Sequence, residues 1–422
     1  MSTGYSLASR WDGNNYENFK AGADLRYVKQ ELNEITSGVN AFQWIDQNSP
    51  IPRSYSSNPG LFVEYDSGDA LGARVTAGAR VDYVGMNVLA DADELAAVGI
   101  NSEVSPLSAA DIWGTDAVNQ HELLGLGYLA LDAVSEDGWS AGAGVGYGER
   151  APNLTERYAI ETFMFLIQNG LNTITGDPSL EKERLLQADL RLGSNVEDVR
   201  GEVRIFHAWV NDYITYEALS AVAAPPAGQI EQLNLKYVNT DLATLWGCEA
   251  RADYEWREGV TPFATVKYIE GEDHSRNGSF DTLPATPGSP SIRVPGVRGA
   301  MSGTGVVAGD NEPLPSILPL ESRIGLRWEE RRERPRWGVE VAARVVDNQN
   351  RVAASLLETP TPGFTVYDLR TFWRPSENLQ LVGGVENFTD KQFREHLDFR
   401  SPSGYTVFRA GVNFYVGTLL TY

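Results

Sequence analysis

Residues 404–422 read GYTVFRAGVNFYVGTLLTY, and this last stretch of the chain decides its fold class. Apolar side chains are expected on one face, and polar or small ones on the other: Phe408, Ala410, Val412, Phe414 and Val416 against Tyr405, Arg409, Gly411 and Asn413. An alternation with a period of two is typical of a β-strand with one apolar face. That face could meet other protein, as in a soluble sandwich, or lipid, as in an outer-membrane barrel.

The same alternation recurs along the chain and predicts about 15 strands of roughly ten residues, the length that a tilted transmembrane strand needs. Before the last strand, they are expected at residues 5–11, 19–27, 61–65, 70–84, 122–133, 140–148, 184–192, 200–216, 237–256, 261–269, 320–328, 337–346, 364–373 and 379–386. Their connections alternate between short turns and long stretches, which include residues 32–59, 87–119, 149–181 and 270–318. Outer-membrane barrels show this alternation, because their periplasmic turns are short and their extracellular loops are long.

The two faces of the predicted strands differ as the faces of a membrane barrel do. The polar face carries most of the charges: Arg74, Arg80, Asp82, Glu249, Arg251, Arg323, Arg327 and Arg409. Tryptophans recur at the short-turn ends of the apolar face: Trp11, Trp256, Trp328, Trp337 and Trp373. Aromatic residues at the edge of an apolar band form the interfacial girdle of such barrels. We therefore predict an all-β fold, an antiparallel transmembrane β-barrel of the outer-membrane type.

The composition argues against several other classes of protein. The formal net charge of -22 argues against nucleic acid as a partner. The single cysteine, Cys248, excludes an intrachain disulfide and is expected on the lipid face. The four histidines are far apart, and no catalytic or phosphate-binding motif is present, so we expect neither an enzyme nor a cofactor or metal site. An acidic cluster at Asp91, Asp93 and Glu94 is expected to be solvated loop charge.

Five segments, in order along the chain, resemble the C-terminal part of the TonB-dependent outer-membrane receptor family. They are GYGERAPNLTERY (146–158), GDPSLEKERLLQADLR (176–191), YVNTDLATLWGCE (237–249), the proline-containing stretch 313–327, and 363–400 with VENFTDK (385–391) and REH (394–396). Asp177 stands where the family usually has Asn, and Lys182 where a proline is common.

The resemblance implies a barrel of about 22 strands filled by an N-terminal plug and preceded by a TonB box. Residues 1–422 are accordingly expected to be an incomplete portion of such a barrel, without the plug and the box. The implied function is an outer-membrane receptor for TonB-dependent uptake of a scarce nutrient, such as a siderophore, cobalamin, a metal chelate or a glycan. Its implied partners are that ligand, outer-membrane lipid and the TonB complex, in a Gram-negative-type bacterium. The alternatives are a passive porin-like or adhesin-like barrel, and a secreted soluble β-protein.

Two groups of residues are singled out as candidate sites. Arg150, Glu156, Arg157 and Tyr158 stand where a strand leaves the barrel, and they would either bind ligand or pin a loop through ion pairs. The second group matches positions of the family signature: Glu386, Asn387, Asp390, Lys391, Arg394 and His396. Because Asn and Asp accept turn geometry, these signature residues are expected to shape the strand end and the loop that follows.

Overall fold

The computed structural model is built almost entirely from β-strands that pair in chain order. It describes residues 1–13, 17–38, 44–68, 72–89, 113, 117–160, 162–168, 170–224, 229–256, 259–280, 300–301, 306–308, 311–356, 358–400 and 406–421. No helix among these residues is long and apolar enough to cross a membrane.

Fifteen strands form one antiparallel meander in which each strand pairs with the next. The first eight are β1 (Ser2–Asp12), β2 (Asn18–Gly38), β3 (Trp44–Asp66), β4 (Ala73–Val88), β5 (Gln120–Val134), β6 (Trp139–Arg150), β9 (Glu183–Val196) and β10 (Val199–Ala224). The others are β11 (Gln229–Tyr254), β12 (Val260–Asp273), β17 (Glu321–Glu329), β18 (Trp337–Val346), β19 (Phe364–Ser376), β20 (Leu379–Glu386) and β21 (Asn413–Leu420).

Shorter elements lie in the long connections. Four of them, β7 (Thr162–Ile167), β8 (Gly170–Thr175), β14 (Ala300–Met301) and β16 (Glu312–Pro313), complete a 19-stranded sheet. The strands β13 (Arg276–Phe280) and β15 (Val306–Ala308) form a separate pair. The remaining elements are a one-turn helix, α3 (Leu154–Tyr158), and a 3-10 turn, η3 (Ala354–Leu356).

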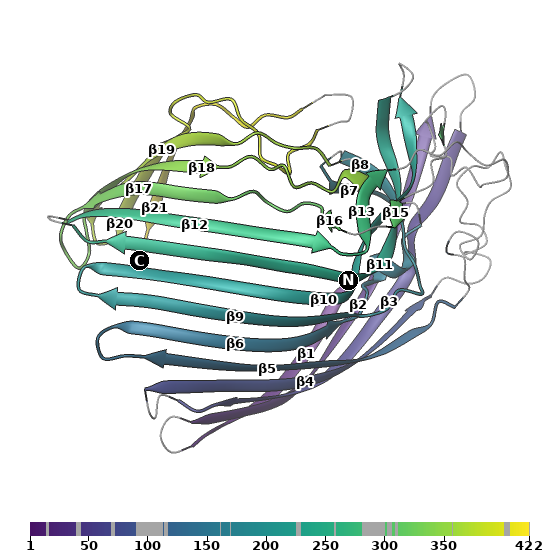
Figure 1. The fold of residues 1–422 in the computed structure, drawn as a ribbon, viewed down its shortest axis with the longest axis horizontal. Helices are drawn as coiled ribbons and strands as arrows, with labels where there is room; N and C mark the ends of the chain where they lie inside the picture. Colours follow the sequence, from purple (N-terminus) through teal and green to yellow (C-terminus); the bar gives the residue numbers. More distant parts are fainter. Residues whose placement is uncertain are drawn as a thin grey trace.

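The meander curves round as part of a barrel wall (Figure 1). Its short turns lie at the left end of the view, whereas β7, β8, β13 and β15 gather at the right end, which we call the mouth. In the described part of the chain β1 pairs with β2 and β21 with β20, and no pairing joins β1 to β21. The predicted fold class, an incomplete antiparallel barrel of about 15 strands, is confirmed.

Several predicted strand boundaries are wrong near the mouth. Most of residues 32–59, predicted as a connection, is strand, because β2 continues to Gly38 and β3 begins at Trp44. Likewise β10 continues to Ala224, and β11 begins at Gln229. Beyond the apolar band the side chains no longer alternate, although backbone pairing continues, so periodicity cannot locate these ends.

The last strand is shorter than its sequence pattern predicts, because Phe408, Ala410 and Val412 precede β21. The backbone there bonds to the preceding connection instead of to β20. Arg409 N donates to Phe393 O, and Ala410 O accepts from Asn387 Nδ2 at 3.3 Å. The Arg409 guanidinium pairs with Asp398 at 2.7 Å, so its predicted place on the inner wall is wrong.

The outer and inner faces of the sheet follow the predicted division. Phe414 and Val416 of β21 are 74% and 87% exposed on the outer face, and the tryptophans near the short turns are more than half exposed: Trp11, Trp139, Trp256, Trp328 and Trp373. The inner face carries ion pairs between strands, such as Arg80 with Asp24 at 2.6 Å and Arg323 with Glu340 at 2.6 Å. The sheet is thus apolar outside and charged inside, as expected of a membrane barrel.

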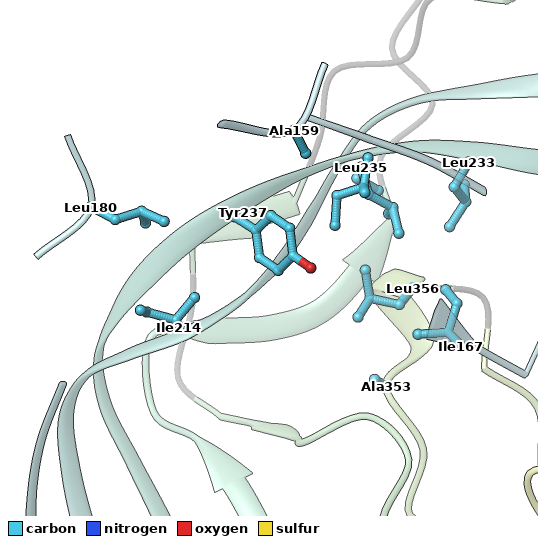
Figure 2. Close-up of a cluster of buried hydrophobic side chains, with 11 residues drawn as sticks. Ala159, Ile167, Leu180, Ile214, Leu233, Leu235, Tyr237, Ala353 and Leu356 are labelled. Atoms are coloured by element: carbon cyan, nitrogen blue, oxygen red, sulfur yellow. The ribbon is translucent and has the colours of Figure 1, made fainter. Parts of the chain in front are cut away.

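A hydrophobic cluster at the mouth joins the wall to the connections (Figure 2). It contains Ala159, Ile167, Ile174, Leu180, Ile214, Ala218, Leu233, Leu235, Tyr237, Ala353 and Leu356. The hairpin of β7 and β8 reaches it by adding β8 in parallel to β11, with Asn234 opposite Thr173 and Lys236 opposite Thr175. Side chains from four separate parts of the chain therefore pack together on the wall at this end.

Candidate functional site

The connection that follows β6 begins with a tightly capped helical turn. Asn153 is the N-cap of α3, and its Oδ1 accepts hydrogen bonds from the backbone N–H groups of Thr155 and Glu156, both at 2.9 Å. Glu156 completes a capping box, because its Oε2 accepts from Asn153 N at 2.6 Å. Such reciprocal bonds satisfy donors that a helix N-terminus otherwise leaves free. The motif PNLTE therefore fixes the direction of the chain as it leaves the wall.

Arg150 ties this turn to the neighbouring strand. Its Nη1 lies 2.9 Å from Glu156 Oε2, and its Nε lies 2.6 Å from Glu183 Oε2 at the start of β9. Glu183 also accepts a hydrogen bond from Ile214 N, which links this network of ion pairs to β10. The Arg150 side chain remains 45% exposed.

Arg157 and Tyr158 are buried. The Arg157 guanidinium donates to Glu122 Oε1 and to Pro178 O, both at 2.6 Å, and the Tyr158 hydroxyl donates to Val118 O at 2.6 Å. Burial raises the pKa of the Tyr158 hydroxyl well above its usual range. The structure thus brings all four predicted residues together, and their contacts fit the role of pinning the loop. A ligand contact stays a prediction, for which the exposed Arg150 is best placed.

The family signature after β20 forms a compact turn. Asn387 and Asp390 adopt left-handed backbone angles, with φ of 49° and 53°, as expected of Asn and Asp in a turn. Asn387 Oδ1 accepts from Lys391 N at 2.9 Å, and its Nδ2 donates to Lys391 O at 2.9 Å. Glu386 accepts from Asn413 of β21 at 3.2 Å. These four residues shape the strand end, while the Lys391 side chain is exposed.

His396 lies in a fully buried polar cluster. Its Nε2 is 3.2 Å from Glu358 Oε1, and its Nδ1 is 3.0 Å from Thr361 Oγ1. The Gln168 side chain, at the end of the β7 segment, donates to His396 O and accepts from Thr359 N at 2.9 Å. This cluster interlocks three connections: β6 to β9, β18 to β19, and β20 to β21. Arg394, the remaining signature residue, is also buried, beside Pro360.

Sequence reasoning missed Gln168 and Glu358, the two residues that complete this cluster. Glu358 also accepts hydrogen bonds from Ser316 N and Ala353 N, both at 2.8 Å. Through Ser316 it contacts the segment between β16 and β17 as well. Neither residue stands in a motif. Gln168 and His396 are separated by 228 positions in the chain, and no local signal marks such a contact.

The inner wall below the mouth is charged and hollowed. Arg344 pairs with Glu321 and with Glu395, each at 2.6 Å, so a wall residue holds the connection between β20 and β21. A hollow farther along the inner face is lined by Asp132, Gln187, Asp189, Arg191, Arg204, Phe206 and Glu249, with Ala130, Gly142 and Ala143. In the described residues no group of three or more His, Cys, Asp or Glu side chains could hold a metal ion. The cluster Asp91, Asp93 and Glu94 lies outside those residues.

An antiparallel wall of alternating faces, with short turns at one end and folded long connections at the other, defines an outer-membrane type of β-barrel. The family described as "TonB dependent receptor-like, beta-barrel" matches residues 2–388. The chain belongs to this family of TonB-dependent receptor barrels, whose members are transporters and not enzymes.

Solved structures with the same fold include one transporter and two receptors. The copper transporter OprC is 20% identical with a TM-score of 0.72, and the match covers 100% of this chain and 56% of OprC. The hemophore receptor HasR of Serratia marcescens, in complex with its hemophore HasA and heme, is 14% identical with a TM-score of 0.60, covering 99% of this chain and 58% of HasR. The ferric yersiniabactin uptake receptor FyuA of Yersinia pestis is 12% identical with a TM-score of 0.57, covering 99% and 54%.

The chain therefore spans little more than half the length of these structural neighbours. Identities this low establish the fold alone. A comparison with curated protein sequences found no significant match.

Proposed function

We propose that this chain forms the barrel of an outer-membrane receptor that takes up a scarce nutrient, with residues 1–422 as one barrel domain. The observation that carries the proposal is the mouth, where Gln168, Glu358 and His396 lock three long connections together and Glu395 ties one of them to Arg344 of the wall. A passive porin needs an open water-filled path at this end. Interlocked connections instead fit a surface that first captures its cargo.

The cargo class is a metal ion, a metal chelate or a heme-like compound. The neighbouring structures are titled for copper, ferric yersiniabactin and heme, and we extend only this class to the present chain. Arg150 is the proposed ligand contact at the mouth, with Glu156, Arg157 and Tyr158 holding it in place. Transport by the receptor is proposed to be energised through TonB, in the outer membrane of a Gram-negative bacterium.

Whole-cell uptake tests this function. The gene that encodes this chain is deleted from its host, and uptake of radiolabelled copper, ferric siderophores and heme is measured under limitation for each. We expect uptake of one cargo to fall to background, both in this deletion strain and in a strain without TonB. Unchanged uptake of every cargo would contradict the receptor proposal. A steady ion conductance of the purified chain in planar bilayers, without any dependence of uptake on TonB, would favour the porin-like alternative.

A further inference from the structure

Two arginines at the mouth lie side by side without a carboxylate partner in the described part of the chain. Arg394 Nη2 and Arg400 Nη1 each lie 3.4 Å from the same acceptor, Pro360 O. Arg400 Nη1 also donates to Thr359 Oγ1 at 3.0 Å. Arg394 is 8% exposed, and its Nη1 is buried with no hydrogen-bond partner among the described residues. A buried guanidinium with an unmatched donor is costly unless an acceptor satisfies it, and an anion is the acceptor that also matches its charge.

Among the described residues, three carboxylates of the same connections are engaged with other partners. Asp398 pairs with Arg409 at 2.7 Å and accepts from Glu395 N. Glu395 itself pairs with Arg344, and Glu358 accepts from His396 and two backbone N–H groups. In a chain with 57 acidic and 35 basic side chains, two neighbouring arginines that make no ion pair among the described residues stand out.

The electrostatic environment agrees with this geometry. Burial and the neighbouring charge of Arg400 outweigh the opposing charge of Asp398 and hold the pKa of Arg394 below its ordinary value. Both effects disfavour the charged guanidinium as long as no anion is present. Arg400 is only partly buried, so solvent reaches the pair from its side.

We propose that Arg394 and Arg400 form a binding site for an oxyanion, either a phosphate or a carboxylate group, at the mouth. A guanidinium group can present two parallel N–H donors to the oxygens of such a group. The anion would bind from the solvent side, at Arg400, and relieve the repulsion between the two charges. This site does not depend on the proposed transport, because anion binding is measurable whatever the receptor carries.

Isothermal titration of the purified chain in detergent micelles tests the site with two probes, inorganic phosphate and citrate, against sodium chloride at matched ionic strength. We expect saturable binding of one or both probes and none of chloride. The probe that binds more tightly identifies the phosphate or the carboxylate chemistry. An absence of saturable binding of both probes would overturn the proposal.

Variants localise the binding. Arg394→Gln and Arg400→Gln should each weaken binding about tenfold or more, because each removes a charged hydrogen-bond donor. Arg394→Lys keeps the charge but loses the fork, so its affinity should be intermediate. The control is Arg334→Gln, at an exposed arginine in the short turn between β17 and β18. If Arg394→Gln does not fold, Arg400→Gln and Arg394→Lys decide, and wild-type affinity in both would overturn the site.

Discussion

At the scale of the residue, Arg157 shows how the motif at the end of β6 acts. Its side chain is 1% exposed and its cationic charge is met by Glu122, which is 17% exposed and lies on β5. A buried ion pair of this kind contributes little net stability, but the loss of one partner leaves a buried charge uncompensated.

We therefore expect Arg157→Met to lower the free energy of unfolding by about 3–5 kcal/mol. Urea unfolding in detergent, followed by tryptophan fluorescence, measures this change. The matched control is the double variant Arg157→Met/Glu122→Leu, which should recover most of the loss because it removes both charges. Wild-type stability of the single variant would show that the pair does not hold the connection.

Asp177 gives the same region a dependence on pH. Burial alone would raise the pKa of Asp177, but hydrogen bonds from Lys236 at 2.7 Å and from Ser179 N at 2.8 Å outweigh it, so the pKa lies below its ordinary value of 3.8. Because the folded pKa is below the unfolded one, the ionised carboxylate stabilises the fold above about pH 4. That stabilisation is lost as the pH falls through the folded pKa.

Asp177→Asn should therefore lower the urea midpoint of unfolding at pH 7. Below pH 4 the midpoint of the variant should fall less steeply on acidification than the midpoint of the wild type. Midpoints of both proteins at pH 7, 5, 4 and 3 give the comparison. The same acid dependence in wild type and variant would mean that Asp177 is not the group responsible.

At the scale of the element, the strands were predictable where their two faces meet different surroundings. In β17 the charged Arg323 and Arg327 alternate with the exposed Ile324 and Leu326, and both ends of the strand were predicted within a residue. At the mouth ends of β2 and β10 the sequence no longer alternates between apolar and polar residues, so periodicity does not locate where these strands end. The interlock around Gln168 was unpredictable for another reason, since it depends on side chains brought together only by the folded wall.

One glycine in β3 shows how closely neighbouring strands depend on each other. Gly60 lies opposite Asp24 of β2 and Asp82 of β4. A Cβ atom at this position would clash with Arg80 Nη2 and Asp82 Oδ1. The absent side chain thus leaves room for Arg80 to reach across β3 to Asp24.

We expect Gly60→Val to displace Arg80 and to cost about 1–3 kcal/mol of stability, the usual range for overpacking. The control is Gly127→Val in β5, where a Cβ atom would approach nothing closer than 3.7 Å. Chemical unfolding of both variants under identical conditions makes the comparison. Equal stability of the two would contradict the view that the ion pair requires this space.

At the scale of the whole molecule, the fold divides the chain into a face for lipid, a face for the lumen and a mouth. The register assigns each strand residue to one face, because directly paired residues share a side. Cys248 pairs with Ile205, which is 49% exposed, and so lies on the outer face, whereas the neighbouring Glu249 borders the hollow on the inner wall. The whole interpretation depends on the outer face meeting lipid.

Cys248 makes this central claim directly measurable, because it is the single cysteine of the chain. A nitroxide is attached to Cys248, and the protein is reconstituted into liposomes. Oxygen, which partitions into lipid, should strongly enhance the spin relaxation of this nitroxide, and a water-soluble nickel chelate should enhance it only weakly. The comparison is the Glu249→Cys variant in a Cys248→Ser background, with the nitroxide on residue 249. There the nickel chelate should accelerate the relaxation of the nitroxide more than oxygen does. The claim predicts this reversal between adjacent residues, and equal access of the nickel chelate to both positions would contradict it.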